Sequence, residues 1–328
     1  MEGLNIAVVG ATGIVGSTFI RIMEERNIPI KNLYPLASAR SAGRKIELDG
    51  REWTVQALRE NSFDEDIDVC FFSAGGHISK VYAPLAAKKG CIVIDNSSVF
   101  RLYEDIPLVI PEVNLETLAK HKGIIANPNC ATAQAAVVLK PLHDAYTLKR
   151  VVYSTYQAVS GAGQEGVMDL RNETFAEGER KKFIYPIAFN IIPHIDEFDV
   201  ETGYTGEELK QMSEMRKVLG LPNLPITVTA VRVPVMNGHS ESINIEFEKE
   251  FDLEDVKTIL ERAKGVKLYD NISKNIYPMP LFVDGKDPVF VGRVRRDFSL
   301  QSGLNMFVSA DNLRKGAALN AVQILENL

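Results

Sequence analysis

The chain has 328 residues, of which 45% are hydrophobic and 24% are charged, the balance of a water-soluble globular protein. This length exceeds what one ordinary hydrophobic core supports, so we expect two domains. The net charge of −6 excludes the basic excess that a nucleic-acid-binding surface needs. Because no apolar run approaches the ~20 residues that span a bilayer, a membrane protein is excluded as well.

The cysteines and the N-terminus predict a cytoplasmic protein. Three cysteines, Cys70, Cys91 and Cys130, are an odd number without metal-ligand spacing, so neither a disulfide framework nor a metal site is predicted. The N-terminus leads directly into strand-like sequence and lacks the pattern of a secretory signal. Cys70 and Cys91 fall inside apolar runs, where we expect them to be buried.

The first predicted strand, residues 4–9, runs directly into the glycine-rich loop Gly-Ala-Thr-Gly-Ile-Val-Gly and then into a helix at Thr18. This order is typical of a dinucleotide-binding fold, in which the pyrophosphate lies at the helix N-terminus. Gly10 allows the tight turn, Gly13 lets the backbone approach the pyrophosphate, and Gly16 lets helix and strand pack closely. An ordinary strand-to-helix turn is the alternative.

The next predicted strand, residues 33–38, favours NADP over NAD. It ends without the acidic residue that binds a ribose 2′-hydroxyl, and Arg40 and Ser41 follow it instead. A guanidinium and a hydroxyl suit a 2′-phosphate, whereas the alternative is an ordinary solvated loop.

Strands and helices continue to alternate, with strands predicted at 68–76 and 91–95 around a helix at 78–89. The alternation predicts an α/β fold with a Rossmann-type, doubly wound sheet that binds ligands at the carboxyl ends of its strands. Arg101 follows such an end. It is expected either to clasp an anionic group such as phosphate or to form a surface salt bridge.

A strand-to-helix elbow is the most informative stretch of the chain. The apolar residues 123–126 lead into Asn-Pro-Asn-Cys, where Pro128 disfavours helix before it, and an alanine-rich helix begins near Ala131. Cys130 therefore lies at the first turn of a helix, where unpaired backbone N–H groups favour a thiolate. We expect these N–H groups and the Asn129 amide to receive an oxyanion. A buried, inert cysteine is the alternative.

Beyond this helix the pattern changes to long alternating β runs, with helices predicted at 207–219 and 253–263. This pattern indicates an α+β domain with a mixed sheet, helices on one of its faces, and another face free to pair two subunits. The strands are expected at residues 150–159, 224–235, 240–247, 290–295 and 304–309.

Four features of this second region matter chemically, one of them a pair of residues. Gln157 stands beside a glycine-rich loop, and Arg232 lies at the polar phase of a strand. Glu207 and Lys210 are spaced i, i+3 on one helix face, where a solvated ion pair is the alternative. Of the five histidines, His239 is the best general acid/base candidate, because it follows a glycine in a turn and is free to reach a site across domains.

A final helix is predicted at 311–322, with small residues on one face, and we expect it to return to the nucleotide domain. Asn312 lies near its start. Either it binds the amide of a nicotinamide ring or it is a plain helix cap.

The ordered set of these motifs resembles the aspartate-β-semialdehyde dehydrogenase family nearly end to end. The shared stretches are Gly-Ala-Thr-Gly-Ile-Val-Gly, Asn-Pro-Asn-Cys130, Tyr-Gln157-Ala-Val-Ser-Gly, Arg232 with His239, and Asp-Asn312-Leu-Arg-Lys-Gly-Ala-Ala. The resemblance implies an NADP-binding domain at 1–130, joined by the C-terminal helix at 311–328. A catalytic and dimerisation domain then occupies 131–310.

The resemblance also implies roles for individual residues. Cys130 becomes the nucleophile, His239 the general acid/base, and Gln157 the residue that orients the substrate or thioester. In the same way, Arg232 is assigned to the substrate carboxylate, Glu207 or its neighbour Glu208 to the substrate ammonium, and Arg101 with Lys210 to phosphate. The implied cofactor contacts are Gly10, Thr12, Gly13, Ile14, Val15, Gly16, Arg40, Ser41, Ser160, Gly161 and Asn312.

The implied reaction is the NADPH-dependent reduction of aspartyl phosphate to the semialdehyde, through a thioester on Cys130. The resemblance places this reaction in the biosynthesis of lysine, diaminopimelate, threonine and methionine. The implied ligands are a small-molecule substrate and inorganic phosphate. The implied assembly is a homodimer or a dimer of dimers. One alternative is an N-acetyl-glutamyl-phosphate reductase, whose nucleophile typically follows Pro-Gly rather than Pro-Asn. A non-catalytic NADP-sensing protein is an alternative of another class.

Overall fold

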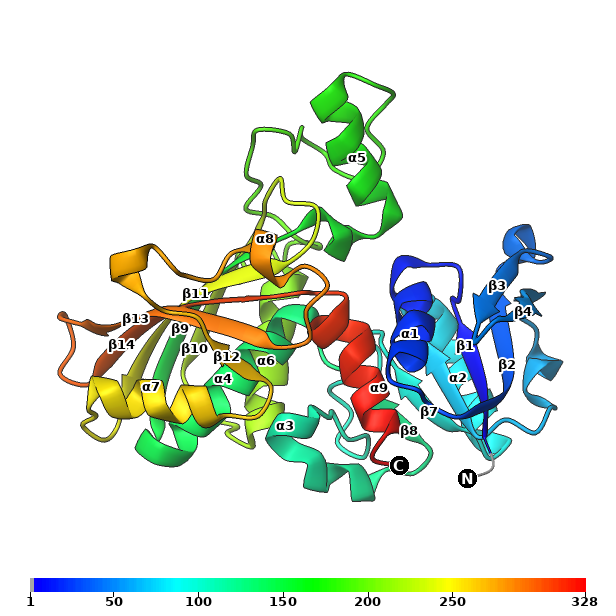
Figure 1. The fold of residues 1–328 in the computed structure, drawn as a ribbon, viewed down its shortest axis with the longest axis horizontal. Helices are drawn as coiled ribbons and strands as arrows, with labels where there is room; N and C mark the ends of the chain where they lie inside the picture. Colours follow the sequence, from blue (N-terminus) through cyan, green and yellow to red (C-terminus); the bar gives the residue numbers. More distant parts are fainter. Residues whose placement is uncertain (1–2) are drawn as a thin grey trace. The chain divides into compact units, whose positions relative to one another are not determined.

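The computed structural model describes residues 3–328. The chain forms two compact units, one made of Met1–Pro128 with Ala317–Leu328 and the other of Asn129–Gly316. The predicted α/β class is confirmed, because one unit contains a parallel sheet and the other a mixed sheet with helices (Figure 1). The second unit begins one residue before Cys130, so the candidate nucleophile and most of the predicted catalytic residues belong to the same unit.

The first unit is built on a six-stranded sheet in the order β5-β2-β1-β6-β7-β8, and every pairing in it is parallel. Its strands are β1 (Leu4–Val9), β2 (Ile30–Ala37), β5 (Gln56–Ala57), β6 (Val69–Phe72), β7 (Ile92–Asp95) and β8 (Ile124–Ala126). The chain crosses to β2 on one side of β1 and to β6 on the other. Ligands bind at such a reversal, outside the carboxyl ends of the strands.

Helices α1 (Ile14–Glu25) and α2 (Gly76–Lys88) connect strands of this sheet, and the short helix α3 (Pro111–Asn114) precedes β8. The C-terminal helix α9 (Leu319–Leu325) packs against α1 and shares its hydrophobic core. Within that core, the rings of Phe19 and Phe71 stack with their centroids 4.1 Å apart. Cys70 and Cys91 are buried as predicted. A hairpin of β3 (Lys45–Leu48) and β4 (Arg51–Thr54) was not predicted from the sequence.

The second unit contains the mixed sheet, in the order β10-β9-β11-β14-β13-β12. Its strands are β9 (Leu148–Gln157), β10 (Ile226–Arg232), β11 (His239–Phe247), β12 (Val266–Leu268), β13 (Val289–Asp297) and β14 (Gly303–Ala310). The pairs β9/β10 and β12/β13 are parallel and the other pairs are antiparallel. The five predicted strands are therefore confirmed, and β12 is an additional three-residue edge strand.

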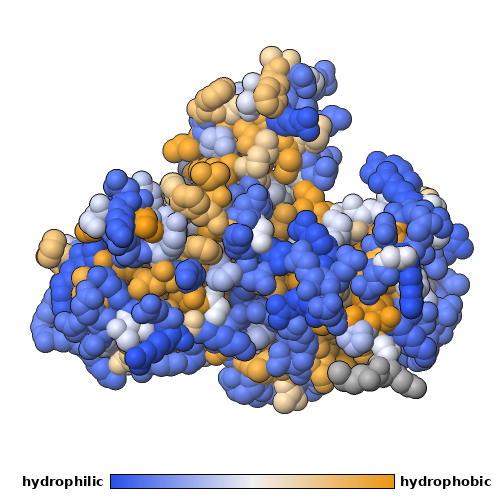
Figure 2. Space-filling view, viewed as in Figure 1, coloured by the Kyte–Doolittle hydropathy of each residue, from blue (hydrophilic) through white to orange (hydrophobic). Residues whose placement is uncertain are grey.

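Helix α4 (Cys130–Tyr146) packs against both α6 (Gly206–Leu219) and α7 (Leu253–Arg262), and all three helices contact this sheet. Helix α5 (Gln164–Phe175) and the chain after it extend away from the sheet, whereas the short helix α8 (Pro280–Val283) lies beside β14 (Figure 1). Figure 2 shows apolar side chains on the surface of this extension. The exposed large ones are Met168, Phe175, Ile184, Tyr185, Phe189, Ile191, Phe198 and Val200.

The last predicted helix has a different form from the expected one. A π-helical stretch occupies Arg314–Ala318, and α9 continues from Leu319. Such wide turns are rare and occur often at functional sites.

The register of three strands gathers candidate residues at one end of the sheet. Arg232 pairs with Gln157 across β10 and β9, and Ser240 pairs with Tyr156 across β11 and β9. His239 therefore lies opposite Gln157. Because side chains alternate along a strand, Gln157, Arg232 and His239 share one face of the sheet. This shared face explains how three residues far apart in sequence come together.

Candidate active site

The elbow before Cys130 has the predicted form. Helix α4 begins at Cys130, and Asn129 is its N-cap: the Oδ1 atom of Asn129 accepts the N–H groups of Ala131 at 2.9 Å and Thr132 at 3.3 Å. Cys130 is partly exposed, whereas Asn129 is buried. The thiol thus lies at the positive end of a 17-residue helix.

Asn129 is held by hydrogen bonds through both its side chain and its backbone. Its side-chain nitrogen donates to Oε1 of Glu207 at 2.8 Å, and its backbone N–H donates to Oε2 of Glu214 at 2.6 Å. Its oxygen already accepts the Ala131 and Thr132 N–H groups, so these groups do not point toward an incoming oxyanion. In this geometry Asn129 caps α4 and orients its first turn.

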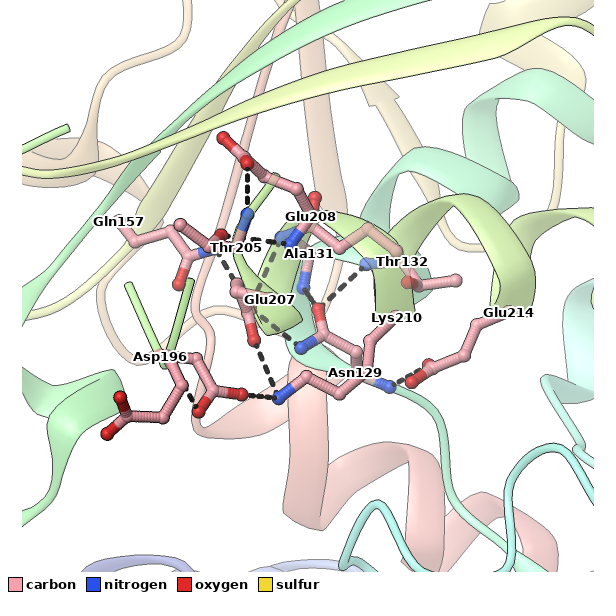
Figure 3. Close-up of polar contacts among 12 residues, drawn as sticks. Asn129, Ala131, Thr132, Gln157, Asp196, Thr205, Glu207, Glu208, Lys210 and Glu214 are labelled. Carbon is pink, nitrogen blue, oxygen red and sulfur yellow. Dashed lines mark hydrogen bonds and ion pairs between the residues drawn. The ribbon is translucent and has the colours of Figure 1, made fainter. Parts of the chain in front are cut away.

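Glu207 lies at the centre of the polar network in Figure 3. Its Oε1 atom accepts hydrogen bonds from the side-chain amides of Asn129 at 2.8 Å, Gln157 at 3.1 Å and Gln211 at 3.1 Å. Its Oε2 atom is 3.3 Å from Nζ of Lys210. Burial alone would raise the pKa of Glu207, but Lys210 and the three amides lower it to about 2. Glu207 is therefore an ionised, buried carboxylate and not part of a solvated pair.

Lys210 holds a second carboxylate as well. Its Nζ atom is 2.7 Å from Oδ2 of Asp196, in addition to its contact with Glu207 (Figure 3). Burial would lower the pKa of Lys210, but the two carboxylates raise it. The ammonium group thus stays charged beside the elbow.

The carboxylate of Glu208 accepts hydrogen bonds from backbone N–H groups of its own unit. Its Oε2 atom accepts the Thr205 N–H at 2.7 Å, and the Thr205 hydroxyl accepts the Glu208 N–H at 3.3 Å, which together form a capping box. The Oε1 atom of Glu208 accepts the Ala230 N–H at 2.9 Å. Of the two neighbouring carboxylates, Glu207 is the one bonded to Gln157 and Asn129.

His239 was expected in the turn before a strand, but it is the first residue of β11 and is fully buried. The Ala158 N–H donates to its Nδ1 atom at 3.0 Å, which places the imidazole proton on Nε2. Within residues 3–328, Nε2 has no hydrogen-bond partner. Burial, together with the nearby Arg232 charge, lowers the pKa of His239 to about 3. The ring is therefore neutral at physiological pH.

Arg232 is buried beside His239. Its Nη1 atom donates to the Ala158 carbonyl at 2.7 Å, and its Nε atom has no hydrogen-bond partner within residues 3–328. Burial lowers the pKa of Arg232, while the charges of Glu207 and Cys130 act in the opposite direction. Geometry links this part of the sheet to the elbow: Gln157, the partner of Arg232 in the sheet, and Asn129, the residue before Cys130, both donate to Glu207.

Two glycines leave room around these groups. A Cβ atom added at Gly161 would lie 3.0 Å from both Nη1 of Arg232 and Nε2 of His239. A Cβ atom added at Gly316, in the π-helical stretch, would lie 2.8 Å from Cβ of Cys130. Glycine is therefore needed for the chain to pass this closely to Cys130.

We expect Gly161→Ala to lower kcat/KM by roughly 10- to 100-fold, because its methyl group would occupy the space in front of Arg232 and His239. Steady-state kinetics of the purified variant would measure this loss. An unchanged midpoint of thermal unfolding would show that the fold is intact. A variant with unaltered kcat/KM would mean that no reactant approaches this position.

Ser160 and Asn312 form a buried polar pair. The Asn312 side-chain nitrogen donates to the Ser160 hydroxyl at 3.0 Å, and its oxygen accepts the Gly238 N–H at 2.9 Å. The carboxylate of Asp311, rather than Asn312, accepts the N–H groups of the following turn. Asn312 thus links the loop that contains Ser160 to the residue before His239, and it is not a helix cap.

The remaining predicted residues lie in the first unit. Gly10 has φ of +90°, and a Cβ atom on it would lie 2.3 Å from the Ser73 carbonyl oxygen. At Gly16 a Cβ atom would lie 2.2 Å from the Gly10 carbonyl oxygen, which explains the close packing of helix and strand. Helix α1 begins after Gly13 without a side-chain cap, so its first N–H groups suit a pyrophosphate. Thr12, Ile14 and Val15 belong to this same loop and first turn.

The residues predicted to bind the 2′-phosphate of NADP also belong to this unit, as does Arg101, one of the two residues predicted to bind phosphate. Arg40 is exposed and Ser41 is buried, in the turn after β2. Arg101 is buried rather than at the surface: its Nε atom donates to the Asn127 carbonyl at 2.8 Å and its Nη2 atom to the Asn96 carbonyl at 2.9 Å. The predicted residues therefore form two sets, one within each unit.

Three residues of the site were missed by the sequence analysis. Gln211 and Glu214 contact Glu207 and Asn129, respectively, and Gly316 packs against Cys130. The spacing of Glu207, Gln211 and Glu214, i, i+4, i+7, was the available signal, because it places all three on one face of a helix.

Comparison with known proteins identifies the class to which this fold and site belong. A family model described as the NAD-binding domain of semialdehyde dehydrogenase matches residues 5–121, and the dimerisation domain of semialdehyde dehydrogenase matches residues 139–315. The class is thus that of the semialdehyde dehydrogenases. In the part of the chain from 3 to 328, no helix has the length and apolar character required to cross a membrane.

Full-length relatives narrow this class. The aspartate-semialdehyde dehydrogenase of Aquifex aeolicus is 53% identical over 99% of this chain and 98% of its own, and that of Bacillus subtilis is 47% identical over 100% and 98%. The solved aspartate semialdehyde dehydrogenase II of Vibrio cholerae, complexed with ASA, is 43% identical with a TM-score of 0.95, covering 100% of this chain and 98% of its own. The chain therefore belongs to the aspartate-semialdehyde dehydrogenase family, oxidoreductases of amino-acid biosynthesis, as the motifs indicated.

Proposed function

We propose that the protein reduces L-aspartyl 4-phosphate to L-aspartate 4-semialdehyde with NADPH, through an acyl thioester on Cys130. In the opposite direction it oxidises the semialdehyde with phosphate as acceptor. The observation that supports this proposal is the site in the second unit. There a partly exposed thiol at a helix N-terminus shares its surroundings with a buried arginine, a neutral histidine and an ionised glutamate.

The charges of the site suit the amino-acid end of this substrate. Arg232, with its unpartnered Nε atom, is assigned to the α-carboxylate, because a guanidinium binds a carboxylate through two parallel hydrogen bonds. Glu207 is assigned to the α-ammonium group, because it stays ionised with a pKa of about 2. Gln157, which donates to Glu207 at 3.1 Å, is assigned to orienting the acyl group.

The reaction requires an attack by the Cys130 sulfur and stabilisation of the oxyanion that forms when the thioester is reduced. The Cys130 thiolate attacks the acyl carbon of the acyl phosphate, a C–S bond forms, and phosphate leaves with the electrons of the C–O bond. NADPH, when bound, supplies the hydride that reduces the resulting thioester. His239 then donates a hydrogen bond from Nε2 to the developing oxyanion, and the C–S bond breaks to release the aldehyde and regenerate the thiolate.

We assign the binding of phosphate to cationic side chains, and the binding of the cofactor to the glycine loop and the turn after β2. We assign phosphate binding to two cationic side chains, Lys210 of the second unit and Arg101 of the first. The glycine loop suits a pyrophosphate, because Gly10 and Gly16 let the turn and α1 pack closely on neighbouring backbone while the first N–H groups of α1 have no side-chain cap. Arg40 and Ser41 are assigned to the 2′-phosphate of NADP, and the Candida albicans relative, 25% identical with a TM-score of 0.77, was solved with NADP. Ser160, Gly161 and Asn312 complete the proposed cofactor contacts.

We propose that two copies pair through the face of the mixed sheet opposite to α4, alone or as part of a dimer of dimers. Tyr156 and Phe307 lie on that face, with ring centroids 6.2 Å apart, and the match to a dimerisation domain supports this assignment. The proposed setting is the cytoplasm and the pathways to lysine, diaminopimelate, threonine and methionine.

The test of this function is the reduction of NADP by aspartate semialdehyde, followed as the appearance of NADPH with and without inorganic phosphate. We expect activity that requires phosphate and that is lost when N-acetyl-glutamate semialdehyde replaces the substrate. Equal rates without phosphate would contradict the acyl-phosphate scheme. A preference for the acetylated substrate would instead favour an N-acetyl-glutamyl-phosphate reductase, and equal efficiency with NAD would contradict the assignment of Arg40 and Ser41.

A further inference from the structure

We propose that Glu214 is a positioning residue that holds the peptide in front of Cys130 and thereby fixes the direction of the thiol. This inference rests on the proposed function, because it concerns the same nucleophile. Glu214 does not contact the reacting atoms in this proposal. It acts through the backbone of Asn129.

The contact that supports this role is short and buried. Glu214 lies in the third turn of α6 and is fully buried, and its Oε2 atom accepts the Asn129 backbone N–H at 2.6 Å (Figure 3). The two residues are 85 positions apart in sequence, so this bond joins the elbow to a separate helix. Hydrogen bonds from a backbone N–H to a carboxylate are shorter and stronger than those to a neutral acceptor.

The elbow has a specific need for such an acceptor. Pro128 carries no backbone N–H, and the Asn129 N–H precedes the first turn of α4, where the helix itself offers no acceptor. The N–H groups of Ala131 and Thr132 are bonded to the Asn129 side chain. Glu214 thus supplies from α6 the acceptor that the local backbone lacks.

Helix α6 contacts Asn129 at two points. Glu207 and Glu214 are seven residues apart, so they lie on the same face of α6. Glu207 accepts the Asn129 side chain at 2.8 Å, while Glu214 accepts its backbone N–H. Two bonds to different parts of one residue restrict its rotation, and the next residue along the chain is Cys130.

Gly316 packs against Cys130, so the orientation of the Asn129 peptide affects where the sulfur can lie. A Cβ atom on Gly316 would lie 2.8 Å from Cβ of Cys130, so the cysteine has little freedom on that side. If the Asn129 peptide turned, the sulfur would move away from the position set by α4. Displacements of about 1 Å at a reacting group cost on the order of 100-fold in rate.

The test compares Glu214→Ala with Glu214→Gln. We expect Glu214→Ala to lower kcat roughly 10- to 100-fold, with KM for the semialdehyde and for phosphate within about twofold. We also expect a similar loss in the rate constant for alkylation of Cys130 by iodoacetamide. Glu214→Gln retains an oxygen that accepts the Asn129 N–H, so it should keep most of both rates.

A matched control distinguishes positioning from general stability. Glu173 also uses its carboxylate to accept backbone N–H groups, those of Ile187 at 2.6 Å and Ala188 at 2.9 Å, in another part of the same unit. Glu173→Ala should lower the midpoint of thermal unfolding without changing kcat or the alkylation rate. If Glu214→Ala shows only this pattern, Glu214 is structural and the proposal is wrong.

Two other outcomes also contradict the proposal. Wild-type kcat in Glu214→Ala would show that the bond to Asn129 does not matter for turnover. Equal losses in Glu214→Gln and Glu214→Ala would show that the negative charge, rather than the hydrogen bond, is needed. Because alkylation needs no substrate, it still reports on Glu214 if the wild-type enzyme fails to reduce NADP with aspartate semialdehyde, a failure that would concern only the proposed reaction.

Discussion

Replacing Cys130 with serine is expected to lower kcat by at least ~10³-fold while leaving the dissociation constant of NADPH unchanged. A serine hydroxyl at the start of α4 is not ionised at neutral pH, so it is a poor nucleophile in the same position. The cofactor loop around Gly10 lies in the other unit and is not altered by the substitution. Steady-state kinetics and a fluorescence titration with NADPH would measure the two quantities.

A control is available in the first unit. Cys91 is buried beside β7, and Cys91→Ala should keep kcat within about twofold of the wild type. A pre-steady-state burst of NADPH, stoichiometric with enzyme when phosphate is omitted, should appear in the wild type and disappear in Cys130→Ser. A serine variant that retains a tenth of the wild-type kcat would exclude a thioester on this residue.

The elbow was predictable because its signals are local. Pro128, the polar Asn129 and the following alanine-rich run define a helix start within a few residues of sequence. The glycine loop was predictable for the same reason: the close approaches at Gly10 and Gly16 follow from positions within one turn. Both stretches combine short-range sterics with a strong residue preference.

The roles of Glu207 and Glu208 could be predicted only in part from the sequence. Thr205 and Glu208 have the spacing of a capping box, so the sequence contained the reason why Glu208 is occupied by the backbone. The environment of Glu207, by contrast, depends on amides from three other positions in the chain. The i, i+4 spacing places Gln211 beside Glu207, but no local pattern reveals that Asn129 and Gln157 converge there.

The state of His239 also depends on long-range structure. Its position opposite Gln157 results from the pairing of β11 with β9, and its bond from Ala158 results from the loop that follows β9. The asparagine and glycine before it suggested that His239 lies in a turn, but the residue begins a strand and is buried. Burial and the neighbouring Arg232 lower its pKa, and neither cause is visible in the residues around it.

His239→Asn is expected to lower kcat by roughly 10²- to 10³-fold, the usual loss when one hydrogen-bond donor to a developing oxyanion is removed. The asparagine Oδ1 atom can take the place of Nδ1 as acceptor for the Ala158 N–H, so the strand and loop should keep their form. What is lost is the donor at Nε2. An asparagine variant with more than a third of the wild-type kcat would show that the imidazole proton is not used.

The pH dependence gives a second, independent check on His239. Its pKa falls from 6.5 to about 3 on folding, so the folded protein keeps the ring neutral where the unfolded chain binds a proton. The stability that this provides is complete above pH 6.5 and is lost as the pH falls toward 3. Between pH 7 and pH 4.5, the midpoint of thermal unfolding should therefore fall more in the wild type than in His239→Asn.

The same comparison separates the titration of His239 from that of Glu207. The pKa of Glu207 changes from 4.5 to about 2, so its own contribution to stability is lost at lower pH and is common to both proteins. In kcat/KM, a neutral ring predicts no loss of activity from titration of His239 between pH 5 and 8. The wild-type pH profile of kcat/KM could show an acid limb between pH 5 and 8 that is absent from the residual activity of His239→Asn. In that case the histidine would titrate in this range, which would exclude a ring held neutral by burial and Arg232.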